Sequence, residues 1–392
     1  MHGLTLLLIF PLGPQQTRLW HPGVTGICTL VAAYPFAVVF GGLVARGMRF
    51  RASSIRQLAL LGCVAALPAA LSTGYDSLLV GRLVAGVAAG ISFVGVHRLI
   101  SGAAARHATR FSSRIVAFGM PLGIFAATWL DWRAGFALIG VGFLVVACMG
   151  GGDSATQTSK DAPEPAEPLP GALFVTGALA LVSAAYLTVL SGFLVFNAGQ
   201  TEYHISAVLL LGAFLGLAVP LLLQGLGARI APVRVWGLSL GVSLLSITGL
   251  LALRGPLPTL PAIGLIAVFL ATQSARHLAL AGLVNAKLEN ASLPVHQTHT
   301  HLAHHLGSGL GAAVAGLVIH RNPQDGTLGG MPALWLVALI ATAAAWLGGL
   351  ALVQAKLRPA ASADAANTFW RMTTSWVRSV RTSITRTPGS PT

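Results

Sequence analysis

The chain has 392 residues, of which 55% are hydrophobic and only 9% are charged, and its formal net charge is +14. A typical soluble domain carries about 25% charged residues, so the composition argues against a soluble protein. Apolar stretches of about 18 to 25 residues recur along the chain, and each can cross the hydrocarbon core of a bilayer as a helix. The ten-residue alternation of a membrane barrel is not visible. These features predict an all-α membrane protein.

The apolar stretches predict twelve membrane spans. In chain order, the expected spans are residues 2–13, 23–45, 55–73, 77–97, 115–130, 134–150, 171–195, 205–224, 235–253, 259–283, 297–319 and 332–355. The first is too short to cross a membrane and is interrupted by Gly13 and Pro14, which leaves open a native start upstream of Met1. It also lacks the basic flank and the cleavage site of a secretory signal.

The distribution of positive charge predicts the orientation. With the N-terminus in the cytoplasm, 18 Lys and Arg residues fall in the inner loops or the tail, and only four fall in the outer loops. The positive-inside rule therefore places both termini in the cytoplasm. Arginine strongly outnumbers lysine, which suggests a bacterial genome and hence an inner (plasma) membrane. Because topology accounts for the net charge, no nucleic-acid partner is expected. The expected partners are the lipid bilayer and a small-molecule substrate, and the expected state is a monomer.

A polar segment divides the chain into two sets of six spans. Residues 150–171 are rich in Gly, Pro and acids, which is typical of a disordered linker. The expected organisation is an N-terminal six-helix half at 1–150, a cytoplasmic linker at 151–170, a C-terminal six-helix half at 171–355 and a basic cytoplasmic tail at 356–392. The tail has apolar residues at helical spacing, so it is either an interfacial amphipathic helix or a frayed basic tail.

Short internal matches indicate that the two halves are duplicates. The loop after the second span contains GLVAR (42–46), and the loop after the eighth contains GLGAR (225–229). Likewise, GMPLG (119–123) in the fifth span corresponds to GSGLG (307–311) in the eleventh. Two matches at similar offsets and at equivalent places favour duplication of a six-helix unit.

Three segments of the first half resemble the major facilitator superfamily of secondary transporters. GGLVARGMRFR (41–51) resembles the loop that this family has between its second and third spans. RLVAGVAAG (82–90) resembles the family's fourth-span pattern, and LDWRAGF (130–136) resembles the usual start of the sixth span. The resemblance implies a twelve-span fold of two six-helix halves, here with a short first span.

The resemblance also implies a gating role for the loop after the second span. The matching positions there include Gly41, Arg46 and Arg49, whereas Ala45 stands where the family usually has an acid. The family's fifth-span antiporter pattern is retained only at Gly119 and Gly123. Proton-coupled drug export is therefore not the expected activity.

Two arginines, Arg82 and Arg276, lie in the interior of expected spans, and no carboxylate does. An ionisable side chain within a membrane costs at least about 2.5 kcal/mol, so it usually faces a cavity or a partner. One interpretation is structural: Arg82 pairs with Asp76 or with a backbone carbonyl, and Arg276 snorkels toward the cytoplasm. The other interpretation is that both arginines bind a ligand.

The family resemblance implies that the first, fourth, seventh and tenth spans line a central cavity. It would place Arg82, Gln273, Arg276 and His277 near that cavity, with Tyr186 as a further hydrogen-bonding group or a helix-packing residue. A cavity lined by arginine and by no Asp or Glu favours an anionic substrate, because guanidinium binds carboxylate or phosphate through two parallel hydrogen bonds. We therefore expect these residues to bind an organic anion.

A histidine cluster begins the eleventh span. The cluster comprises His296, His299, His301, His304 and His305. The repeat places it at the cytoplasmic mouth, and helix geometry lets at most two or three of its imidazoles converge without help from another helix. Three interpretations stay open for His301, His304 and His305: a hydrated, pH-sensitive rim, a proton-coupling group, or a transition-metal site.

The leading hypothesis is a secondary active transporter that moves a small anionic organic solute by alternating access. One alternative is transport of a transition-metal ion or of a siderophore-like metal chelate by means of the histidines. Another is a non-transporting assembly or scaffold protein with the same fold. No enzyme activity and no cofactor are expected, because Leu302 takes the place of the glutamate in H-E-x-x-H and no G-x-S-x-G motif is present.

Overall fold

A computed structural model describes residues 20, 23–50, 54–99, 132–149, 169–196, 232–252, 259–285, 293–322, 324 and 328–354, and parts of 207–218. Its helices are α3 (Gly23–Ala45), α4 (Ser54–Ala70), α5 (Tyr75–Leu99), α7 (Trp132–Met149), α8 (Pro170–Phe196), α10 (Pro232–Ala252), α11 (Thr259–Asn285), α12 (Leu293–Val318) and α13 (Met331–Gln354). Outside the described residues lie the expected first and fifth spans, most of the eighth span, nearly all of the linker, and the tail.

A short hairpin joins α12 to α13, although the sequence predicts only a loop between the last two spans. In it, β1 (His320–Arg321) pairs antiparallel with β2 (Leu328–Gly329), with His320 opposite Gly329. The next residue, Gly330, has a φ of +80°, and a Cβ there would overlap the Val318 carbonyl. Glycine is therefore required at the start of α13, since other residues adopt positive φ only at a cost.

Local sequence explains several helix starts. α8 and α10 begin at Pro170 and Pro232, and proline is favoured there because the first turn of a helix does not use its N–H groups. The turn before α5 is held by the Ser77 hydroxyl, which accepts hydrogen bonds from the backbone N–H groups of Thr73 (3.1 Å) and Gly74 (3.0 Å). Side chains thus satisfy backbone donors where the chain reverses.

The surface of the helices is strongly apolar. Four described helices are long and apolar enough to cross a membrane, within Gly23–Ala45, Tyr75–His97, Pro170–Leu190 and Met331–Leu350, and four more apolar helices are shorter. Large side chains such as Leu71, Leu245 and Leu317 are 74%, 72% and 85% exposed. Extensive apolar exposure is unfavourable in water and suits a lipid environment. The protein is therefore a multi-pass membrane protein.

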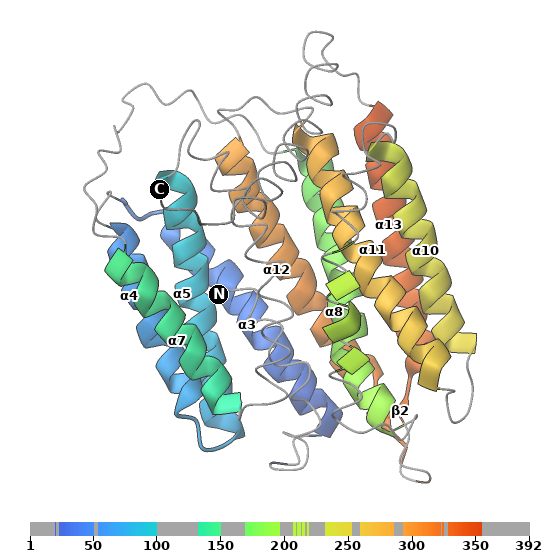
Figure 1. The fold of residues 1–392 in the computed structure, drawn as a ribbon, viewed down its shortest axis with the longest axis horizontal. Helices are drawn as coiled ribbons and strands as arrows, with labels where there is room; N and C mark the ends of the chain where they lie inside the picture. Colours follow the sequence, from blue (N-terminus) through green and yellow to red (C-terminus); the bar gives the residue numbers. More distant parts are fainter. Residues whose placement is uncertain are drawn as a thin grey trace, which may run out of the picture.

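The described helices stand alongside one another in two groups, with α12 between them (Figure 1). α3 packs on α5, α5 on α4 and α4 on α7, while α8 packs on α13 and α10 on α11 and α13. α12 contacts α8 of the second group as well as α3 and α5 of the first. The contact between α12 and the first group thus joins segments from the two sides of the expected linker.

Glycines on α12 allow it to approach α3 closely. A Cβ on Gly309 would lie 2.9 Å from Cε1 of Phe36, and one on Gly316 would lie 2.7 Å from Cβ of Cys28. Near the same end, the Thr25 hydroxyl donates a 3.3 Å hydrogen bond to the Gly316 carbonyl. Small residues at such contacts are the usual basis of helix association in membranes.

Candidate functional site

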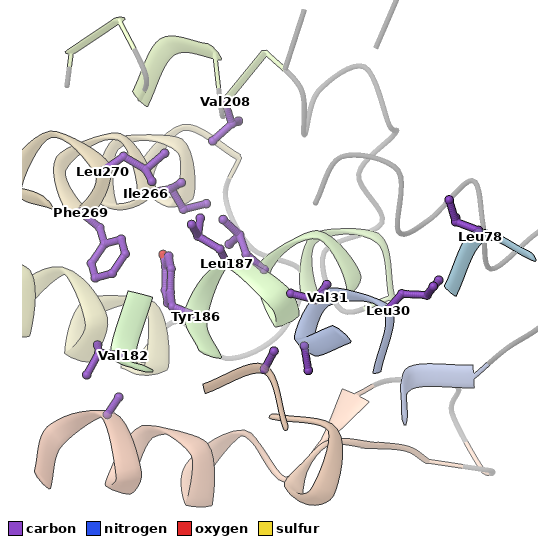
Figure 2. Packing of buried hydrophobic residues seen from close by; sticks show 14 of the residues in the cluster. Leu30, Val31, Leu78, Val182, Tyr186, Leu187, Val208, Ile266, Phe269 and Leu270 are labelled. Atoms are coloured by element: carbon purple, nitrogen blue, oxygen red, sulfur yellow. The ribbon is translucent and has the colours of Figure 1, made fainter. Parts of the chain in front are cut away.

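Buried apolar side chains form a cluster that extends across the two helix groups (Figure 2). Leu30 and Leu78 belong to the first group, whereas Tyr186 and Phe269 belong to the second. Within the cluster, the rings of Tyr186 and Phe269 lie 4.2 Å apart, and those of Tyr186 and Trp335 lie 5.8 Å apart. These three aromatic residues come from α8, α11 and α13, so the fold brings together side chains far apart in the sequence.

Arg276 adds a permanent cation to this aromatic group. Its side chain is 2% exposed, and its Cζ lies 5.6 Å from the centre of the Phe269 ring. That distance is within the range of a cation–π interaction, which stabilises a desolvated guanidinium. A snorkelling side chain would hold its head group in solvent, whereas the head group of Arg276 is buried. Arg276 lies seven residues after Phe269, so both occupy nearly the same face of α11.

Four buried polar atoms in this region have no hydrogen-bond partner among the described residues. They are Nη1 of Arg276, Nε2 of Gln273, Oη of Tyr186 and Nε1 of Trp335. A buried donor without a partner costs about 1 to 3 kcal/mol, and more if it is charged. Most buried polar groups in a packed protein interior have a hydrogen-bond partner. A cluster of unpartnered donors is therefore expected where a ligand or a water molecule completes the hydrogen bonds. All four atoms can donate, so the complementary ligand group is an acceptor.

Arg82 has a different environment. It is fully buried, its Nε donates a 2.7 Å hydrogen bond to the Leu30 carbonyl, and its Cζ lies 5.3 Å from the Tyr34 ring. Both contacts are with α3, so Arg82 ties α5 to its neighbour. This geometry matches the structural alternative of a backbone carbonyl partner. The ligand-binding role expected for Arg82 stays a prediction.

The remaining expected site residues have varied positions. His277 lies in α11, but its side chain is outside the described part of the chain. Gly41 is buried in α3, where a Cβ would overlap the Val87 carbonyl of α5. Arg46 and Arg49 follow α3 and are exposed. Gly41 therefore allows α3 and α5 to pack closely. The gating role of the loop that follows α3 stays a prediction.

The histidines lie deeper in the helix than the sequence indicated. α12 begins at Leu293, four residues before the expected start, with Pro294 in its first turn. His305 is buried, and His301 stacks on Phe93 of α5 with ring centres 4.8 Å apart. A hydrated rim therefore does not describe His305, which lies buried in a contact between helices, whereas His301 is partly exposed and the rim stays a prediction for it.

His97 was not singled out from the sequence, yet its ring stacks on His301 at 5.5 Å. A signal existed: the fourth span is expected to end, and the eleventh to begin, at the same face of the membrane. Phe269 and Trp335 gave no comparable signal, because aromatic residues are ordinary in an apolar span. Among the described residues, no three His, Cys, Asp or Glu side chains converge as a metal site requires.

Comparisons with known proteins concern the fold. No protein-family model matches the chain, and no curated protein matches it by sequence. The inward-open xylose transporter XylE from E. coli is similar in structure, with a TM-score of 0.65 at 13% identity over 94% of this chain and 96% of that one. The nucleoside transporter NupG gives 0.60 at 15% identity, over 91% and 98%. An auto-inhibited POT family peptide transporter gives 0.64 at 12%, over 92% and 98%.

These similarities extend over nearly the whole length of each chain. The protein therefore has the fold of the major facilitator superfamily, as the loop and span motifs predicted. The described residues are largely helical, as the predicted all-α membrane fold requires, apart from the short β1–β2 hairpin.

Proposed function

We propose that the protein is a secondary active transporter that moves a small organic anion across the membrane by alternating access. Two lines of reasoning support the transporter class: the fold, and the joining of two helix groups through α12. In transporters with repeated halves, the substrate binds near the midplane where the halves meet. Gln273 lies about 20 Å from either end of α11, at about 1.5 Å per residue. The residues that supply the four unpartnered polar atoms, namely Tyr186, Gln273, Arg276 and Trp335, therefore lie at a depth that suits a substrate site near the midplane.

The observation that carries the anionic substrate is the buried Nη1 of Arg276, which has no hydrogen-bond partner among the described residues. The helices that supply the group, α8, α11 and α13, contain no Asp or Glu. A carboxylate or phosphate on the substrate would supply the missing countercharge and accept hydrogen bonds from Arg276 and its neighbours. The aromatic rings would cover the apolar part of the solute.

We further propose that both termini and the linker at 151–170 are cytoplasmic and that the membrane is a bacterial inner membrane. The support is the excess of Lys and Arg in alternate loops. On this orientation, the N-terminal end of α12 and the C-terminal end of α5 lie at the cytoplasmic face. The protein would act as a monomer, with each half supplying one side of the transport path.

A ligand panel tests the proposal. Purified protein in detergent is heated with monocarboxylates, dicarboxylates and phosphate esters, and with D-xylose and a nucleoside as neutral comparisons. A bound ligand raises the apparent unfolding temperature by mass action. The expected result is stabilisation by at least one anion and by neither neutral solute. Stabilisation by neutral solutes alone would contradict an anionic substrate.

Substitution of Arg276 tests the site. With the stabilising anion as ligand, Arg276→Gln is expected to weaken binding by about 1.5 to 3 kcal/mol, or roughly 10- to 150-fold, because a charge-assisted hydrogen bond is lost. Isothermal titration calorimetry measures the change. Arg234→Gln is the matched control, since Arg234 is exposed in the first turn of α10. Equal affinity in both variants would remove Arg276 from the site.

A further inference from the structure

A stack of aromatic rings connects α5 to α12. His301 of α12 stacks on Phe93, with an interplanar angle of 20° and ring centres 4.8 Å apart. It also stacks on His97, one helical turn further along α5, with an angle of 27° and a separation of 5.5 Å. His301 therefore contacts two rings of a helix that precedes the expected linker, while its own helix follows that linker.

The next turn of α12 extends this contact to α3. His305 lies tilted against Phe93 at 5.8 Å and edge-on to Tyr34 of α3 at 6.2 Å. His304 lies beside His305 at 5.7 Å. These rings join the two helix groups at the end of the molecule where α5 ends and α12 begins. Any movement that separates the groups at this end must break the stack of His97 on His301.

We propose that His97 and His301 form a proton-binding site in this contact and that protonation of both imidazoles separates α5 from α12. Neutral imidazoles stack like other aromatic rings. One imidazolium is tolerated, since a cation over the Phe93 ring gains a cation–π interaction. A second positive charge 5.5 Å away is repelled by the first. Both residues are partly exposed, at the end of the molecule where α5 ends and α12 begins.

The surrounding groups offer little to offset a second charge. None of α3, α8, α12 and α13 contains an Asp or a Glu. On α5, Asp76 is in the first turn, about 30 Å from His97 along the helix, and Arg98 follows His97 in the sequence. The helix α4, which also packs on α5, likewise has no Asp or Glu. The other titratable groups on the packed helices are Cys28 and Tyr34 on α3, Arg56 and Cys63 on α4, Tyr75 and Arg82 on α5, Tyr186 on α8, and His296, His299, His304 and His305 on α12.

The inference goes beyond the proposed function, because it concerns the ion that drives the conformational change and not the solute. It does not depend on the substrate being an anion. A distance measured between the two helix groups without any substrate therefore tests it, and failure of anion binding would leave that test intact.

Two spin labels report the separation of the groups. Cys28, Cys63 and Cys148 are replaced by alanine, and Gln57→Cys and Arg234→Cys provide exposed sites on α4 and α10. Their distance is measured by double electron–electron resonance in lipid nanodiscs at about pH 8 and about pH 4, since partial burial disfavours a charged imidazole and the lower pH must overcome this cost. We expect the distance distribution to shift to longer values at the lower pH. No shift would overturn the proposal.

Histidine variants assign the shift to the pair. The double variant His97→Gln/His301→Gln should lose the pH-dependent shift, and His320→Gln, at an exposed position in β1, should keep it. His301→Phe retains a ring that can stack but not ionise, so it should hold the short distance at both pH values. Size-exclusion profiles check folding, and His301→Phe alone decides if the double variant does not fold. A shift in His301→Phe equal to that of the parent protein would overturn the proposal.

Discussion

Two tyrosines of the protein have hydroxyl groups in opposite environments. Tyr75 Oη donates a 2.9 Å hydrogen bond to the Gly26 carbonyl and so ties α5 to α3. Tyr186 Oη is buried and has no hydrogen-bond partner among the described residues. The first hydroxyl stabilises the fold, whereas the second carries a desolvation cost that a substrate acceptor could relieve.

This difference predicts opposite effects of the same substitution. Tyr186→Phe should leave the unfolding temperature unchanged or raise it, and should weaken anion binding by about 0.5 to 1.5 kcal/mol. Tyr75→Phe should lower the unfolding temperature and leave the affinity unchanged. Thermal unfolding and calorimetric titration of both variants measure these effects. If Tyr186→Phe destabilises the protein without changing affinity, its hydroxyl is structural.

At this scale, the sequence could identify polar residues in apolar spans but not their partners. Arg276, Gln273 and Tyr186 were predicted because each stands out from its surroundings, and the structure places all three around Phe269 or on the same helix. Arg82 stood out for the same reason, yet its Nε donates a hydrogen bond to a carbonyl of α3. The distinction depends on which helix packs alongside, and this is a tertiary property.

α12 contacts both helix groups. Its glycines show which of these contacts can adjust and which cannot. A Cβ on Gly311 would overlap the Leu181 carbonyl of α8, which belongs to the backbone and cannot move aside. The nearest atoms to a Cβ on Gly309 would be those of the Phe36 ring, which is 37% exposed and can rotate. The two glycines lie two residues apart on one helix, so they provide a matched comparison.

Gly311→Ala should therefore be much more damaging than Gly309→Ala. We expect a loss of about 1 to 3 kcal/mol for Gly311→Ala through overpacking. For Gly309→Ala the change should be smaller, since alanine also favours the helix by about 1 kcal/mol. The midpoint of thermal unfolding in detergent measures both. Equal midpoints would mean that α8 and α12 adjust their separation freely.

Helix positions were largely predictable, and the errors have a physical cause. The expected span at 23–45 coincides with α3, because a continuous apolar run fixes both ends. The start of α12 was missed because Pro294 and the polar residues after it lower the hydropathy. Helix formation depends on the backbone, which proline tolerates in a first turn, so the helix extends beyond its apolar part.

For the whole molecule, the fold alone does not identify a solute. Structures similar to this chain carry xylose, nucleosides or peptides according to their names. Specificity must then come from the side chains that meet the solute. The short motifs indicated the fold because they lie in loops and helix contacts common to it, while the solute depends on residues that differ between such proteins.

The proposed topology predicts where a protease can cut. Lys160 lies in the linker at 151–170, so trypsin should cleave there in inverted membrane vesicles and leave the linker intact in right-side-out vesicles. Detergent should expose the site in both preparations, which controls for intrinsic resistance. Immunoblotting for the two halves of the chain measures the cleavage. Cutting in sealed right-side-out vesicles would reverse the orientation.

Counterflow in proteoliposomes tests the central claim most directly, because it requires alternating access but no coupling ion. Vesicles are loaded with the unlabelled anion that stabilises the purified protein and are then diluted into a trace of the same anion in radiolabelled form. A transporter should accumulate the label transiently, and Arg276→Gln should abolish that accumulation at the same ligand concentration. Binding of the anion without any counterflow would contradict the account and identify a scaffold or receptor with a transporter fold.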